Sequence, residues 1–203
     1  MEEQLWKACS DGKIEEVTKL LQNSQIDINW QNRSNNLRTS FYVACREGHI
    51  DIVKLFLKDN RVDINKTNEF GCTPFYQACF NGHIDIVKLL LNDERADINK
   101  ASNDGWTALN AICYNGHIEI VKLLSNDTRI DINKADKNGW TPFYTACRYE
   151  KTEVVKYLLE SGREIDINRK DNDGKTGLDW ARERGNKDIV TIIESFQKIK
   201  ESK

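Results

Sequence analysis

The stretch NGHIDIVKLLLNDERADINK, residues 81–100, sets the pattern for the whole chain. Nearly the same sequence recurs at residues 115–134, as NGHIEIVKLLSNDTRIDINK. A similar sequence, EGHIDIVKLFLKDNRVDINK, occupies residues 47–66. Successive Gly-His pairs are therefore 34 residues apart. A repeat of this period predicts a solenoid, in which each unit is too small to fold alone and buries its apolar faces against its neighbours.

Each copy reads as two helices and a connecting loop. Thr73 and Pro74 form a helix start, with Thr as the N-cap and Pro at the first helical position. Gly82 suits the left-handed residue that ends this helix. The following segment, IDIVKLLL, is so apolar that its partner helix and both neighbouring units must cover it. The Asp-Ile-Asn segment and the turn at residues 103–105 then predict an extended arm and a tight turn.

These residues resemble the ankyrin repeat. The resemblance rests on the Thr-Pro-Phe-Tyr of residues 73–76 and on the elements that follow it, which are Ala78-Cys79, Gly82-His83, Ile86-Val87, Leu89-Leu90-Leu91 and Asp97-Ile98-Asn99. It covers nearly the whole chain in about six copies. It implies an all-α repeat solenoid, with a helix-turn-helix and a β-hairpin-like finger in each unit. We therefore expect one domain over residues 1–203, with repeats at about 1–33, 34–67, 68–101, 102–135, 136–170 and 171–203.

The sequence departs from the Thr-Pro-Leu-His that is usual in ankyrin repeats at the start of the first helix. Tyr42, Tyr76 and Tyr144 stand in the His position of three copies, and Asn110 and Asp179 stand there in two others. The hydrogen bond that this His usually makes is therefore not expected in these copies. The fold itself does not depend on it.

The terminal units are predicted to be caps. Glu16 and Lys19 in the first unit occupy positions that hold Ile52 and Leu55 in the second, and Glu194 in the last unit replaces a Leu. Polar residues at otherwise apolar positions are what an exposed end face requires. The second helix of the last unit is expected to continue into the polar tail.

Two units are irregular. The first finger has two extra residues, and Leu37 stands where later fingers have Gly, so this finger must turn differently. Glu150 replaces the helix-ending Gly of the fifth unit. A left-handed Glu would carry strain on the order of 1 kcal/mol. We therefore expect the turn at Glu150 to be rebuilt.

Composition argues against several classes of partner. Thirty Lys and Arg oppose 32 Asp and Glu, which leaves a net charge of -2. This balance gives no electrostatic reason to expect nucleic acid or an anionic membrane. The chain has no apolar run of the ~20 residues that a membrane span requires, and the residues at its N-terminus give no reason to expect a secretory signal. A reducing cytoplasm is the expected compartment, with the nucleus left open.

Cysteine and histidine in register invite a metal or catalytic interpretation, which geometry disfavours. Equivalent residues in adjacent units are separated by about 8–10 Å, whereas two sulfur ligands of one zinc ion lie within about 4 Å. The in-register cysteines are therefore expected to be small buried hydrophobes. Cys72 lies outside this register and is the one thiol expected to react. By the resemblance, His49, His83 and His117 join turn backbones between units. No catalytic residue, metal or cofactor is predicted.

The positions that differ between repeats predict the binding surface. In ankyrin proteins the finger tips and the ends of the first helices form one concave surface. Aromatic residues and Arg are typical of protein-binding hot spots, and on this chain the surface would carry Arg38, Arg46, Phe70, Phe80, Trp106, Tyr114, Trp140, Arg148 and Tyr149. An alternative for Trp106 and Trp140 is that they only stack finger against finger.

The sequence thus predicts a non-catalytic module that binds a protein or peptide on its concave face. The module is expected to be a monomer that binds neither nucleic acid nor membranes. The alternative is a self-assembling structural or scaffold protein, which uses its convex side or capping helices for contacts between copies. Light scattering would separate the two classes.

Overall fold

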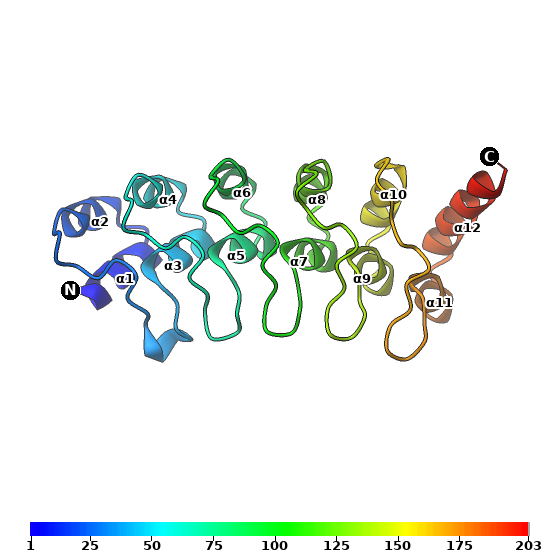
Figure 1. Cartoon of the computed structure of the whole chain (residues 1–203), viewed down its shortest axis with the longest axis horizontal. Helices are drawn as coiled ribbons and strands as arrows, with labels where there is room; N and C mark the ends of the chain where they lie inside the picture. Colours follow the sequence, from blue (N-terminus) through cyan, green and yellow to red (C-terminus); the bar gives the residue numbers. More distant parts are fainter. Residues whose placement is uncertain (203) are drawn as a thin grey trace. The chain divides into compact units, whose positions relative to one another are not determined.

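The computed structural model describes residues 1–202 and divides the chain into two compact units, Met1–Asn103 and a second one from Asp104 onward. The first unit contains three helix pairs, and the second contains three more (Figure 1). In the first unit the helices are α1 (Glu2–Ser10), α2 (Ile14–Leu21), α3 (Ser40–Glu47), α4 (Ile50–Leu57), α5 (Pro74–Phe80) and α6 (Ile84–Leu91). In the second they are α7 (Ala108–Asn115), α8 (Ile118–Ser125), α9 (Pro142–Arg148), α10 (Thr152–Glu160), α11 (Gly177–Glu183) and α12 (Lys187–Glu201).

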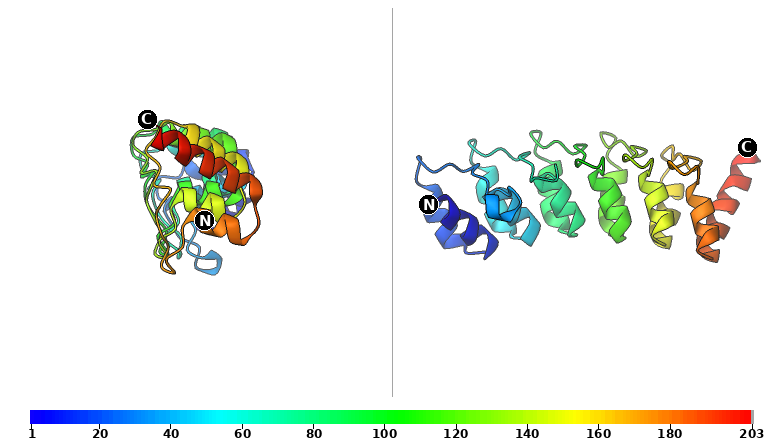
Figure 2. Two further views of the ribbon diagram at one scale, coloured as in Figure 1. Left: turned by 90° about the vertical axis from the view of Figure 1, so that its right-hand side faces the viewer. Right: turned by 90° about the horizontal axis from the view of Figure 1, so that it is seen from below.

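Within each unit the first helices lie against one another, and the second helices do the same. Thus α3 contacts both α1 and α5 in the first unit, and α9 contacts both α7 and α11 in the second. In Figure 1 the second helix of each pair lies above the first, and the long loops project below. The right-hand view of Figure 2 shows the helices of each unit as adjacent rods, with the connecting loops along one edge. This is the repeat solenoid that the sequence predicts.

Threonine fixes the start of the first helix in five repeats. The hydroxyls of Thr39, Thr73 and Thr141 accept hydrogen bonds at 3.0–3.1 Å from the backbone N–H of the third helical residue. Thr107 and Thr176 do the same within full capping boxes, in which a side chain on the helix bonds back to the Thr N–H. The helix start predicted at Thr73-Pro74 is confirmed.

Close approach of a His ring explains two of the glycines that end the first helices, Gly12 and Gly48. Gly48 adopts a φ of 84°, and a Cβ on it would lie 2.7 Å from the ring of His83. His83 Nε2 lies 2.8 Å from the carbonyl oxygen of Arg46, and His49 Nε2 lies 3.2 Å from that of Ser10. These His residues therefore join the turn of one repeat to the preceding one, as the resemblance implied.

Glu150 corrects one prediction. Its φ is 58°, in the left-handed region, and the turn around it is not rebuilt. Its N–H donates to the carbonyl of Cys147 at 3.2 Å, and the next N–H donates to Ala146 at 2.9 Å. Gly82 and its successor make the same pair of bonds. The hydrogen bonds and neighbouring helices thus hold Glu150 in a conformation that Gly would adopt without strain.

The first finger turns differently from the others, as its two extra residues predict. It contains a short 3₁₀ helix, η1 (Arg33–Asn35), followed by two left-handed residues, Asn36 and Leu37, each with φ of 58°. An isolated antiparallel bridge joins Asn32 to Arg38. Within residues 1–202 no strand is longer than such a bridge, so the other fingers are tight turns. Successive fingers are linked by backbone bonds, for example from Glu69 N–H to Asn36 at 3.0 Å.

The core consists of the apolar residues that the repeat aligns. Cys9, Cys45, Cys79, Cys113 and Cys147 are free thiols with no exposed surface, so the interpretation as small buried hydrophobes is confirmed. Burial raises the pKa of these thiols, which keeps them protonated and unreactive. On α2, Glu16 is exposed where later repeats bury Ile, and Lys19 is exposed where they carry a half-buried Leu, in agreement with a polar end face. No described helix is long and apolar enough to cross a membrane.

Candidate functional site

The candidate surface is built on fingers whose shape is fixed by a buried Asn or Asp at their base. Asn68 accepts the N–H groups of Phe70 and Cys72 at 3.1 and 2.9 Å. Asp136 accepts those of Asn138 and Trp140 at 2.9 and 2.8 Å. Asp171 makes the equivalent pair of bonds at 3.0 and 2.9 Å. These hydrogen bonds hold the backbone of each of these finger tips in one conformation, so the side chains on it have fixed positions.

Tyrosines in the usual His position bind to these same bases. In the first unit Tyr42 is fully buried, and its oxygen accepts from Asn68 Nδ2 at 3.0 Å while its O–H donates to Gln77 at 2.8 Å. In the second unit the O–H of Tyr144 donates to the carboxylate of Asp171. The expected loss of the His bond is thus offset by a bond from the longer Tyr side chain, which ties the first helix to the next finger.

Asp171 is charged although it is buried. Burial raises its pKa, but hydrogen bonds from Tyr144, the Lys175 N–H and the Trp180 indole outweigh this effect, and the pKa lies below its usual range. Burial, together with the neighbouring Asp171 carboxylate, raises the pKa of the Tyr144 phenol. The finger base is therefore an ionised acceptor at neutral pH.

In the second unit three of the four predicted aromatic residues form a continuous chain of rings. The centroids of Trp106 and Tyr114 are 5.7 Å apart, with the planes at 70°. Those of Tyr114 and Tyr149 are 4.5 Å apart, with the planes at 73°. All three side chains are partly exposed. The Trp106 indole N–H also donates to Asp136 at 2.9 Å, so Trp106 both contributes to this surface and supports the next finger.

Beside this chain, Arg148 lies between two tryptophans. Its guanidinium carbon is 4.5 Å from the ring centroid of Trp140 and 3.8 Å from that of Trp180. Trp140 in turn stacks on Tyr144 at 5.8 Å. The structure therefore brings all five predicted residues of this unit onto its fingers and first helices, in two clusters. We call the first, Trp106, Tyr114 and Tyr149, the ring chain, and the second, Trp140, Arg148 and Trp180, the arginine sandwich.

The four predicted residues of the first unit are not gathered in this way. Phe70 is the most exposed, at 53 % of its surface, on a finger tip. Phe80 stacks on Tyr76, with centroids 6.4 Å apart. Arg46 pairs with the neighbouring Glu47, and Arg38 lies 6.0 Å from the Tyr42 ring. They are therefore separate groups and not one cluster, and all but Phe70 are only partly exposed.

Trp180 was not among the predicted residues. It lies on α11 at a repeat position that holds Thr145 in the preceding repeat, and nothing in the sequence signals that it meets Arg148. Its indole N–H lies 3.3 Å from the Asp171 carboxylate. Lys175 Nζ is 4.7 Å from its ring centroid. The only available clue was a tryptophan at a position that holds smaller residues, Val43, Gln77, Ala111 and Thr145, in the earlier repeats.

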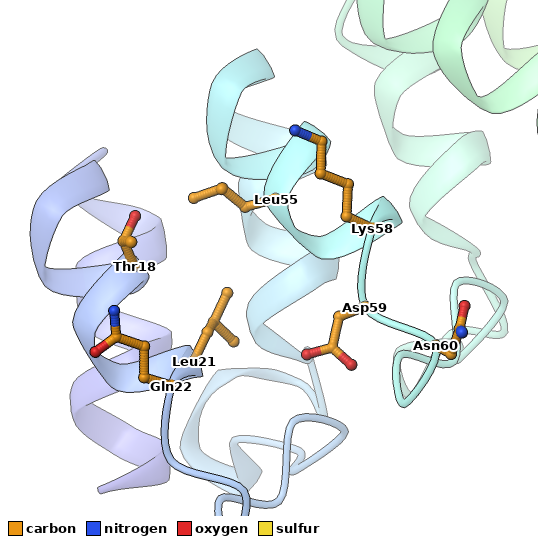
Figure 3. Close-up of a pocket in the computed structure, with 7 residues that line it drawn as sticks. All are labelled: Thr18, Leu21, Gln22, Leu55, Lys58, Asp59 and Asn60. Atoms are coloured by element: carbon orange, nitrogen blue, oxygen red, sulfur yellow. The ribbon is translucent and has the colours of Figure 1, made fainter.

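A shallow groove lies elsewhere, between α2 and α4 of the first unit. Its cavity volume is about 340 Å³. In Figure 3, Leu21 from α2 and Leu55 from α4 extend into the space between the helices, with Gln22 and Asn60 at its ends. Lys58 and Asp59 also line it, and Asp59 pairs with Arg61 at 2.6 Å. None of the predicted binding residues lines this groove, and it contains no Cys, His or Ser.

The described residues hold no group of three or more His, Cys, Asp or Glu side chains that could bind a metal ion. His49 and His83 contact backbone carbonyls, as described above. The fingers and first helices therefore carry partly exposed aromatic and cationic side chains on a backbone fixed by hydrogen bonds.

Two family models match the chain, both described as ankyrin repeats. The first, of three copies, matches residues 57–136 and 129–200, and the second, of many copies, matches residues 20–76. The chain belongs to the ankyrin repeat family. Among solved structures it is similar to the ankyrin repeat protein EF0377, with a TM-score of 0.84 and 28 % sequence identity over 96 % of this chain and 98 % of that one. No curated protein matches the sequence. Ankyrin repeats generally serve as non-catalytic modules of protein–protein interaction.

Proposed function

We propose that this ankyrin repeat protein binds a protein or peptide partner on the face formed by its fingers and first-helix ends. One observation carries the proposal, which is the ring chain of the second unit. Trp106, Tyr114 and Tyr149 contact one another edge to face, yet each stays partly exposed. Aromatic rings held rigid at a surface provide contact area at little entropic cost, which is typical of a binding hot spot.

The opposite side of the repeats differs in character. The outer faces of the second helices carry ion pairs three residues apart, such as Lys54–Asp51 at 3.0 Å and Lys122–Glu119 at 2.8 Å. Exposed charge pairs of this kind favour solubility and contribute little to binding. The contrast between the two sides supports placing the partner on the aromatic side.

The test compares capture of partners from a soluble lysate by three proteins. One variant carries Tyr114→Ser with Tyr149→Ser, and the control carries Lys54→Ser with Lys122→Ser on the outer helices. Trp106 stays unchanged because its indole supports Asp136. With all three shown folded by circular dichroism, we expect a partner retained by the wild type and the control and lost from the tyrosine variant. Retention by all three proteins would place the site elsewhere.

Further properties belong to the same proposal. The protein acts without catalysis or cofactor, as a monomer, and binds neither nucleic acid nor membranes. Its buried free thiols favour a reducing compartment, the cytoplasm.

A second candidate function is self-assembly through α12. Ile199 is 56 % exposed, and it borders an apolar groove of about 280 Å³ between α10 and α12, which Leu159, Ile192 and Phe196 also line. A second copy of the chain covering this groove would make the protein a scaffold. Light scattering over a range of concentrations tests it, because Ile199→Glu should abolish any association that the wild type shows, whereas a monomeric wild type rules it out.

A further inference from the structure

The fourth and fifth repeats place different residues at the same position beside a tryptophan. Trp106 and Trp140 directly precede the N-cap threonines of α7 and α9. In the fifth repeat the guanidinium carbon of Arg148 lies 4.5 Å from the Trp140 ring centroid. Tyr114 holds the equivalent position on α7, and its ring centroid lies 5.7 Å from that of Trp106. The fourth repeat therefore has an aromatic ring where the fifth has a cation.

The cation of the fifth repeat has a carboxylate beside it. Arg148 also lies 3.8 Å from the Trp180 ring centroid, and the Trp180 indole N–H donates to Asp171 at 3.3 Å. The other donors to Asp171 are the Tyr144 O–H and two backbone N–H groups, all of them neutral. The positive charge of Arg148 therefore balances the negative charge of Asp171, and this site is complete within the chain.

The fourth repeat has the carboxylate without the cation. Trp106 donates its indole N–H to Asp136 at 2.9 Å, in the same way as Trp180 donates to Asp171. The other donors to Asp136, which is 7 % exposed, are neutral N–H groups of its own finger. No Lys or Arg among residues 1–202 forms an ion pair with Asp136. Through the hydrogen bond, this carboxylate polarises the Trp106 indole and makes its ring faces more negative.

The two tyrosine rings beside Trp106 are accessible. Tyr114 and Tyr149 lie edge to face with centroids 4.5 Å apart, and both are partly exposed. In the described part of the chain no Lys or Arg lies over either tyrosine ring. Lys151, two residues after Tyr149, packs its methylene groups close to Gly116 instead. The faces of aromatic rings attract cations, so these tyrosines can accept a positive group from outside the chain.

We propose that the ring chain receives the cationic side chain of a Lys or Arg of the partner protein or peptide. The partner then supplies to the fourth repeat the cation that Arg148 supplies to the fifth. A carboxylate on the partner is repelled by the same ring faces, and the net charge of -2 on the chain favours a basic partner over an acidic one. This inference rests on the proposed function, and it adds the chemistry of the partner to it.

The test uses three hexapeptides, blocked at both ends, in which Ser alternates with Lys, with acetyl-lysine or with Glu. Acetylation keeps the length of the Lys side chain and removes its charge. Binding is followed by NMR through the ring signals of the tyrosines, assigned by substitution. We expect the Lys peptide to shift the signals of Tyr114 and Tyr149, and the other two peptides to leave them unchanged.

Two variants test the residues that carry the inference. Tyr149→Leu stays apolar but lacks the ring, and it should weaken binding of the Lys peptide by about threefold, as expected for the loss of one exposed cation–π contact. The matched control is Tyr157→Leu, which removes a partly exposed tyrosine of α10 outside the ring chain and should leave the affinity unchanged. Asp136→Asn should weaken binding by about twofold or more, because it removes the charge. Asn68 accepts the equivalent pair of backbone bonds in an earlier finger, so Asn maintains this finger.

The remaining outcomes each contradict the inference. Equal binding of the Lys and acetyl-lysine peptides would show an apolar site without preference for charge, and preferred binding of the Glu peptide would reverse the assigned chemistry. Unchanged affinity of the Lys peptide for Tyr149→Leu and for Asp136→Asn would place its binding elsewhere. If the wild type binds none of the peptides but captures a partner that the tyrosine variant loses, the proposed function stands and this inference fails. If the tyrosine variant retains the partner, the proposed function itself fails.

Discussion

Glu150 provides a quantitative test of how the repeats are held together. Its left-handed φ of 58° is reproduced in the same position by Gly48, Gly82 and Gly116 at 79–84°. A side chain in this region costs roughly 1–2 kcal/mol. Glycine removes that cost but gains freedom in the unfolded chain worth about 0.4–1 kcal/mol. Glu150→Gly should therefore stabilise the protein by about 0.5–1 kcal/mol.

The carboxylate of Glu150 contributes little to this balance. Its only described ion pair joins it to Arg184 at 3.9 Å, with both side chains about half exposed, and exposed pairs are worth about 0–1 kcal/mol. Glu150→Ala removes the same carboxylate but keeps the left-handed backbone strain. It is therefore the matched control, and its stability should lie within about 0.5 kcal/mol of the wild type or below it.

Urea denaturation followed by circular dichroism provides the assay. With a denaturant slope of about 2 kcal/mol per molar, the Gly variant should shift the midpoint upward by about 0.3–0.5 M, and the Ala variant should not. Equal upward shifts for both variants would show that the carboxylate, and not the backbone, was unfavourable. A lower midpoint for Gly than for Ala would refute the assignment of strain to Glu150.

Four further predictions follow from described contacts. Gly48→Ala should destabilise the protein by about 1–2 kcal/mol in the same assay, because its Cβ would meet the His83 ring in a left-handed backbone; an unchanged midpoint would contradict this. Arg61→Ala should cost about 1 kcal/mol, since its guanidinium bonds three carbonyls of the preceding repeat at 3.1–3.4 Å; a loss no larger than for Lys54→Ala would refute the bonds. A thiol reagent should modify one cysteine of the native protein, Cys72, and all six after unfolding; labelling that survives Cys72→Ser would identify another thiol. The pKa of Asp171 is depressed in the folded state, so its contribution to stability is present above about pH 4 and is lost as pH falls through the native pKa. Asp171→Asn should therefore reduce the loss of stability that the protein shows on acidification. An unchanged dependence of stability on acid pH would contradict the ionised finger base.

The repeat itself was predictable because it depends on local chemistry written many times. The Thr N-caps, the glycines that end the first helices and the in-register cysteines each have one physical role, and the structure confirms these roles. The longer first finger was predictable from a residue count alone, since two extra residues must be accommodated. Here the sequence pattern and the backbone geometry are linked directly.

The contacts that distinguish one repeat from another were not predictable. Arg46 and Arg148 share a register, yet one pairs with its neighbour and the other lies between two indoles, which depends on a tryptophan one repeat further on. The bond from Tyr144 to Asp171 likewise joins residues from adjacent repeats. The rule that residues other than Gly avoid the left-handed region fails at Glu150, because backbone hydrogen bonds to the preceding helix hold its turn in place. Each of these features depends on packing between two particular repeats, and a sequence pattern common to all repeats does not contain that information.

The central claim is that the fingers and first-helix ends contact the partner. Site-specific photo-cross-linking tests it directly, with a photoreactive phenylalanine analogue placed at Phe70 or Tyr114 on the proposed face and at Lys54 or Lys122 on the outer helices. We expect a cross-linked partner from the first two positions and none from the other two. Cross-links from Lys54 or Lys122, with none from Phe70 or Tyr114, would contradict the account and place the partner on the outer helices.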